Sequence, residues 1–127
     1  MIKSILSLVG SLALVSASAL AHSGIELGPN GGRIVEFSKD ETLHGELTLK
    51  DGQFRISLLD HAMKPVKLES QVVTASGGPT GKAVKLEVTR AGDQFVLPAV
   101  KPGEWLILQY RPEPKAKPIT ARVEYNT

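Results

Sequence analysis

The chain has 127 residues and a formal net charge of +2, which gives room for one small domain with one core. It contains no cysteine, and this excludes disulfides, thiolate metal ligands and attachment of a lipid to cysteine. Lysine and arginine are scattered along the chain, so no basic run follows a phosphate backbone and a nucleic-acid partner is not expected.

The first 21 residues predict a secretory signal peptide. Lys3 is their only charged residue, Ile5–Val15 is apolar, and the segment ends in Ala-Leu-Ala at Ala21. A basic start, a short apolar stretch and small residues before the cleavage point are typical of export signals. The apolar stretch is too short for a membrane span, which needs about 20 residues. We therefore expect cleavage after Ala21, a periplasmic or secreted protein without a membrane span, and a single domain over residues 22–127.

Beyond residue 30, apolar and polar residues alternate with the period of two that is typical of β-strands. The expected strands are Arg33–Phe37, Thr42–Leu49, Gln53–Leu59, Val66–Ala75, Ala83–Arg90, Gln94–Pro98, Glu104–Arg111 and Ile119–Tyr125. The breaks between them are rich in glycine, proline or charge, and no long segment has a helical period. This spacing predicts an all-β fold, an immunoglobulin-like sandwich of about 7–8 antiparallel strands.

The pair Asp51-Gly52 predicts a two-residue hairpin turn between two of these strands. Such a turn sets the pairing of the flanking residues, which are expected to be Lys50 with Gln53, Glu46 with Ser57, and His44 with Leu59. Alternation then directs Leu47 and Ile56 into the core, while Glu46 and Ser57 face away. On this basis the side chain of Glu46 is expected to contribute little to stability in the absence of a metal ion.

Large apolar side chains on the strands supply the expected core. The candidates are Trp105, Phe54, Phe95, Leu58, Leu86, Val88, Ile107 and Val123. Pro112–Pro118 is expected to be an exposed loop, because proline has no N–H to donate in a central strand.

Two histidines and a carboxylate on the same hairpin are candidate metal ligands. His44 and Glu46 share a face about 6.5–7 Å apart, and His61 follows the opposing strand, from where it can approach His44. Two imidazoles and a carboxylate suit Zn or Cu. Cleavage of the signal peptide would make His22 the amino terminus, and its free amine and ring nitrogen together suit Cu(II). Asp60 is a further candidate ligand.

The alternative is that these residues are ordinary polar groups of a sheet and a turn. A catalytic function is not expected, since the chain has no Gly-x-Ser-x-Gly motif and the segment SGGPTGKA lacks the phosphate-loop spacing. Asp60 and His61 are adjacent, so on a strand they point to opposite faces and do not form a dyad.

The segments PNGGRIVE, LHGELTL and FRISLLDHAMKPV resemble the small metal-associated β-domain found in, or beside, periplasmic adaptor proteins of RND-type heavy-metal efflux systems. The family pattern has a His-Gly-Gly turn, a strand with His-x-Glu-Leu, and a strand that ends in Leu-x-Asp before Lys-Pro-Val. The similarity covers residues 29–66 and carries over to His44, Glu46 and Asp60, whereas Asn30 stands where the family has histidine.

The resemblance implies an exported carrier or buffer of a Cu or Zn ion, or an accessory of metal efflux with a periplasmic efflux component as its partner. The alternative function is that of a metal-free, immunoglobulin-like structural or interaction module of the cell envelope. Its adhesive surface would then be the strand edges.

Overall fold

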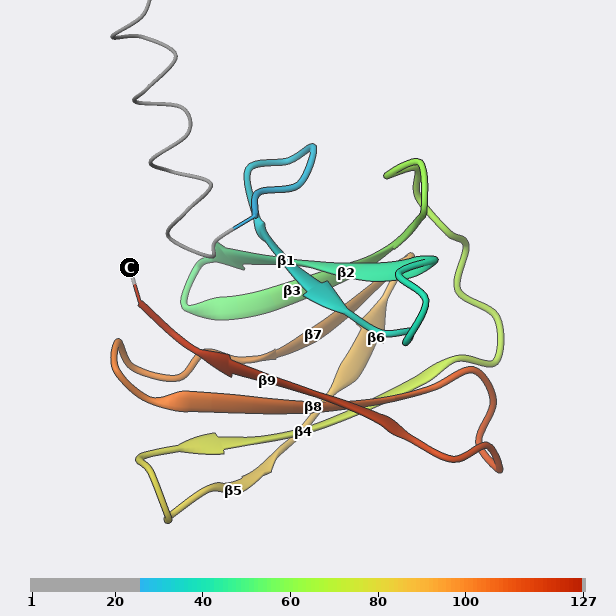
Figure 1. Ribbon diagram of the computed structural model, residues 1–127. Coiled ribbons are helices and arrows are strands. Elements are labelled where there is room, and N and C mark those ends of the chain that lie inside the picture. Colours follow the sequence, from blue (N-terminus) through green and yellow to red (C-terminus); the bar gives the residue numbers. More distant parts are fainter. Residues whose placement is uncertain (1–25, 127) are drawn as a thin grey trace, which may run out of the picture.

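The computed structural model describes residues 26–126, and in this part of the chain it contains strands and no helix (Figure 1). The strands are β1 (Arg33–Glu36), β2 (Leu43–Lys50), β3 (Gln53–Asp60), β4 (Val72–Gly78), β5 (Val84–Leu86), β6 (Thr89–Ala91), β7 (Gln94–Pro98), β8 (Trp105–Arg111) and β9 (Ile119–Glu124). Nothing helical within residues 26–126 is therefore long and apolar enough to span a membrane. The expected signal peptide and His22 lie outside the described residues.

The strands form two antiparallel sheets that pack as two layers (Figure 1). The five-stranded sheet has the order β1-β2-β3-β7-β6, and the four-stranded sheet has the order β5-β4-β8-β9. The chain passes between the sheets after β3, after β5 and after β7. The prediction of an all-β sandwich is confirmed.

The core lies between the two layers and is built from side chains that both sheets direct inward. Phe37, Ile56 and Leu108 have at most 1% of their surface exposed, and burial of each such side chain contributes about 1.5–3 kcal/mol. Phe37 also stacks on Tyr110 of β8, with ring centroids 5.2 Å apart, and so connects the sheets. A Cβ atom at Gly45 would lie only 2.5 Å from the Phe37 ring, which explains a glycine in the middle of β2.

The β2–β3 hairpin has the register that its turn predicts. Lys50 pairs with Gln53, Glu46 with Ser57, and His44 with Leu59. Asp51 and Gly52 have φ angles of 54° and 77°, which is the left-handed geometry that this kind of turn requires at both positions. Leu47 and Ile56 are buried in the core, as expected.

The core face of β8 differs from the prediction. Trp105 and Ile107 are half-buried on the outer side of the sheet, whereas Leu106 and Leu108 are fully buried between the sheets. The segment WLIL is apolar at every position, so alternation alone does not identify its inner face. Of the other core candidates, Phe54, Phe95, Leu58 and Val123 are buried, and Leu86 and Val88 pack against the core while partly exposed.

Two expected strands have different bounds because they contain crossings between the sheets. The segment expected at 66–75 becomes a strand only at Val72, since Pro65 and Val66 still pair with the end of β3. The segment expected at 83–90 divides into β5, which pairs with β4, and β6, which pairs with β7. A period of two continues through such a crossing, so it does not reveal the change of sheet.

Candidate functional site

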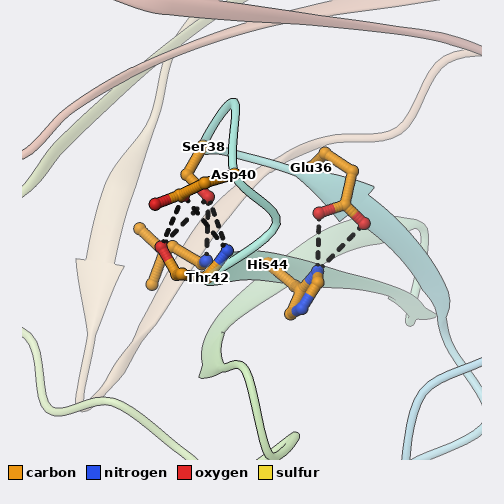
Figure 2. Close-up of polar contacts among 6 residues, drawn as sticks. Glu36, Ser38, Asp40, Thr42 and His44 are labelled. Carbon is orange, nitrogen blue, oxygen red and sulfur yellow. Dashed lines mark hydrogen bonds and ion pairs between the residues drawn. The ribbon is translucent and has the colours of Figure 1, made fainter.

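The pairing of β1 with β2 brings Glu36 opposite His44 on the outer face of the five-stranded sheet. His44 Nδ1 forms a hydrogen bond with Glu36 Oε2 at 2.9 Å and lies 2.7 Å from Oε1 (Figure 2). Oε1 is buried and has no hydrogen bond to the described part of the chain. The His44 side chain is 8% exposed and that of Glu36 is 41% exposed. The imidazole is therefore removed from water, while the side chain of Glu36 as a whole is still partly exposed.

A short polar turn between β1 and β2 holds this pair in place (Figure 2). Ser38 Oγ accepts hydrogen bonds from the backbone N–H groups of Thr42 at 2.9 Å and Leu43 at 3.0 Å. Thr42 Oγ1 donates to Asp40 Oδ1 at 2.7 Å. The hydrogen bond from the Thr42 side chain, followed by that from Ser38, lowers the pKa of Asp40 below its ordinary value. The ionised carboxylate thus stabilises the turn that fixes β1 against β2.

The Glu36–His44 pair has a defined chemical consequence for the imidazole. When Nδ1–H donates to the carboxylate, the neutral ring keeps its lone pair on Nε2. No hydrogen bond joins Nε2 to any residue of the range 26–126. A carboxylate that accepts from one ring nitrogen is the usual partner of a histidine that coordinates a metal through the other. His44 is therefore an oriented imidazole whose second ring nitrogen has no hydrogen bond to the described residues.

Glu46 lies on the same face as His44, as expected, but its carboxylate is bound by the turn before β1. Oε2 accepts hydrogen bonds from the backbone N–H of Asn30 at 2.8 Å and of Gly32 at 2.9 Å. Oε1 accepts from the Asn30 side-chain amide at 2.9 Å, and the Glu46 residue is 1% exposed. A carboxylate offers about four acceptor positions, so three donors leave little capacity for a metal ion.

Because of these hydrogen bonds, we expect Glu46 to contribute to stability, contrary to the expectation from the sequence. The turn is shaped around its carboxylate: a Cβ atom at Gly28 would lie 2.6 Å from Glu46 Cδ, and one at Gly32 would lie 2.8 Å from Glu46 Cγ. Glycine at both positions lets the backbone approach the carboxylate closely enough to donate to it. The role of Glu46 in this structure is to anchor the turn.

The end of β3 contains the two remaining candidates in the described chain. Asp60 Oδ1 accepts hydrogen bonds from the backbone N–H of Ala62 at 2.8 Å and of Lys64 at 3.0 Å. The bond from Lys64 is the main reason why the pKa of Asp60 is lowered. His61 is exposed in this turn. Asp60 therefore acts as a turn residue here, as Asp40 does between β1 and β2.

The structure does not bring the predicted ligands together as one set. Between residues 26 and 126, no three His, Asp or Glu side chains are placed to hold a metal ion. His44 is paired with Glu36, Glu46 with the turn at Asn30, and His61 stands apart in its own turn.

Glu36 is the site residue that the sequence argument missed. Its pairing with His44 follows if the polar segment Ser38–Thr42 is taken as a hairpin loop, because residues 36 and 44 are then symmetric about Asp40. A loop of this length has no single preferred register, unlike the two-residue turn at Asp51-Gly52. The signal was therefore present but weak.

Comparison with known proteins adds no relative. No family model matches the chain, and no curated protein or solved structure matches it either. The Glu36–His44 pair is therefore the structural feature on which a function can be proposed.

Proposed function

We propose that this protein is an exported, non-enzymatic β-domain that binds a divalent or copper ion, as a carrier or buffer or as an accessory of metal efflux. His44 supplies the principal ligand atom, Nε2. The observation that carries the proposal is the Glu36–His44 pair, in which a nearly buried imidazole is held through Nδ1 by a carboxylate. The proposal keeps the function that the resemblance implies and changes the expected set of residues, because Glu36 now positions the ligand.

Of the residues expected to bind a metal ion, His44 is arranged as a metal ligand, whereas Glu46 and Asp60 are not. His44 fits because its ring is oriented and Nε2 has no partner in the described chain. Glu46 does not fit in this arrangement, since Asn30 and Gly32 already donate to it, and Oδ1 of Asp60 is also occupied. His61 is exposed and stands apart from His44 in the described structure, so it and His22 at the new amino terminus are the secondary ligands of this proposal. Imidazole ligands suit Zn and Cu.

Calorimetric titration of the mature protein with Zn(II), Cu(II) and Cu(I) tests this proposal. His44→Ala should abolish binding, and Glu36→Gln should weaken it about 10–100-fold, as is usual when the partner of a ligating histidine is removed. Glu69→Gln is the matched control, since Glu69 is an exposed carboxylate whose side chain forms no bond in the described structure. Affinity should also fall in acid, because a protonated imidazole does not coordinate a metal.

Two further variants distinguish the possible sites. His61→Ala should weaken binding less than His44→Ala, because His61 has no positioning partner in the part of the chain that is described. Binding by His44→Ala as tight as that of the unmodified protein would contradict the proposal. Loss of Cu(II) binding only when His22 is removed would assign the metal to the amino terminus and exclude the strand residue.

A further inference from the structure

The outer face of the four-stranded sheet carries two adjoining hollows. The larger, of about 400 Å³, is lined by small side chains of β4 and by Ile107 and Gln109 of β8, with Lys85 and Arg111 as its charged members. The second, of about 280 Å³, lies between Trp105, Arg122 and the loop that joins β4 to β5. Ile107 lines both hollows, so they form one continuous surface. The apolar residues that β8 does not direct into the core are thus part of this surface.

The strand register arranges the charges of this face in a row. Lys85 pairs with Ser76, Ser76 with Ile107, and Ile107 with Arg122, so these residues cross all four strands in the order β5-β4-β8-β9 (Figure 1). Neighbouring strands lie about 4.8 Å apart, so the two cations at the ends of the row are separated by roughly 14 Å at the backbone. Between the two cations lie the hydroxyl group of Ser76 and the apolar side chain of Ile107.

The cations of this face are not neutralised within the described chain. The one ion pair within residues 26–126 is between His44 and Glu36, on the other sheet. Lys85, Arg111 and Arg122 therefore form no ion pair with the described residues. No aspartate or glutamate lines either hollow. Two carboxylates lie at the margin of this surface: Glu87 lines a neighbouring hollow together with Lys85, and Glu124 pairs with Trp105 at the end of β9. The hollows therefore present an excess of positive charge.

We infer that this face binds an extended acidic segment of a partner protein. An extended chain rises about 3.3 Å per residue, so two carboxylates four residues apart are separated by roughly 13 Å. That spacing matches the separation of Lys85 and Arg122, and the residue midway between the carboxylates would lie between Ser76 and Ile107. The expected motif is an acidic residue, any residue, an apolar residue, any residue, and a second acidic residue.

Trp105 and the arginines favour a polypeptide as the occupant. Tryptophan and arginine are enriched among the residues that dominate the energy of protein interfaces. Trp105 and Ile107 are half-buried, so they offer apolar surface beside the cations without being part of the core. The surface lies on the opposite side of the sandwich from the Glu36–His44 pair (Figure 1), and the inference does not depend on metal binding.

Trp105 is the single tryptophan of the chain, so its fluorescence reports on this surface alone. The probe is a capped peptide of the order Glu-Ser-Leu-Ser-Glu, titrated into the mature protein at low salt and at physiological salt. We expect a saturable change in Trp105 emission that weakens as salt screens the charges. The double variant Lys85→Gln/Arg122→Gln should lose about tenfold in affinity.

A matched control separates this surface from general charge effects. Lys39→Gln/Lys50→Gln removes the same charge from exposed positions outside the four-stranded sheet and should retain the affinity of the unmodified protein. An equal loss in this control would overturn the inference, as would equal binding of a peptide with glutamine in place of glutamate. A response to inorganic phosphate or a sulfated polysaccharide, but not to the peptide, would also overturn it.

Discussion

The outer face of the five-stranded sheet differs from that of the four-stranded sheet in how its polar side chains are used. On the five-stranded sheet, His44 is bonded to Glu36, and Glu46 to the turn at Asn30. Gln94 donates to Ser57 across the strands at 2.9 Å. These groups face outward by strand alternation, but their hydrogen bonds are within the protein.

On the four-stranded sheet the outward side chains remain largely free. The hydroxyl of Thr74 reaches Gln109 at 3.5 Å, the outer limit of a hydrogen bond, and Lys85 and Arg122 are exposed without an ion pair in the described chain. A buried polar group that loses its partner costs free energy, whereas an exposed charge contributes little. Substitutions should therefore affect stability on the first face and binding on the second.

A substitution in the core is the reference against which changes on the two outer faces are compared. Leu47 is 5% exposed and lies next to Glu46 on the opposite face of β2. Leu47→Ala should lower the free energy of unfolding by about 2–5 kcal/mol, because it removes buried methyl groups and leaves a cavity. Urea unfolding at neutral pH measures the change. A loss below about 1 kcal/mol would mean that this site is not part of the core, because such losses are typical of exposed positions.

Glu46→Ala provides the sharpest test of the five-stranded face. The change leaves the buried N–H of Gly32 and the N–H of Asn30 without their acceptor, so we expect a loss of about 1–3 kcal/mol, measured by urea unfolding without metal. Glu41→Ala is the control, since Glu41 is exposed and its side chain forms no bond in the described residues. Equal effects of the two changes would show that the outer faces do not differ.

The contrast between Glu46 and its neighbours also shows what the sequence can predict. The register of β2 and β3 follows from Asp51-Gly52, because a two-residue turn is local and has few geometries. The outward direction of Glu46 follows from that register. The burial of Glu46 does not follow from the register, because this burial depends on the path of the glycine-rich turn before β1.

The same limit applies to the four-stranded face. Trp105 and Ile107 alternate with Leu106 and Leu108, and all four are apolar, so the inner face of β8 is decided by packing against the other sheet. The pairing of Glu36 with His44 likewise requires the geometry of a longer loop. The two-residue turn at Asp51-Gly52 was predictable, whereas the pairing across the longer loop and the contacts between distant segments were not.

Acid should weaken the five-stranded sheet through the carboxylates of its turns. Hydrogen bonds lower the pKa of Asp60 below its ordinary value of 3.8, chiefly the bond from the Lys64 N–H. A carboxyl with a lowered pKa in the folded state stabilises the fold above its unfolded pKa, and this stability is lost as the pH falls through 3.8 toward the lower folded value. The effect should be smaller than that of Glu46→Ala, because the group is exposed and screened.

Urea unfolding at neutral pH and near pH 3 tests this dependence. Asp60→Asn removes the charge but keeps a side-chain oxygen for the turn, so the variant should lose less stability between the two pH values than the unmodified protein. Glu124→Gln removes a carboxylate from the four-stranded sheet and is the control with which Asp60→Asn is compared. The same pH dependence in Asp60→Asn and in the unmodified protein would contradict the role given to this carboxylate.

The smallest effect on stability is expected for the cations of the four-stranded face. Lys85→Gln/Arg122→Gln should change the free energy of unfolding by no more than about 0.5 kcal/mol, because both side chains are exposed and unpaired in the described chain. Arg33→Gln is the contrasting variant, since Arg33 Nη1 donates to the backbone oxygen of Glu124 at 2.8 Å, and its loss should cost about 0.5–1.5 kcal/mol. Thermal and urea unfolding measure both changes. If the double variant were the more destabilised of the two, these cations would serve the fold, and a surface left free for a partner would not exist on that sheet.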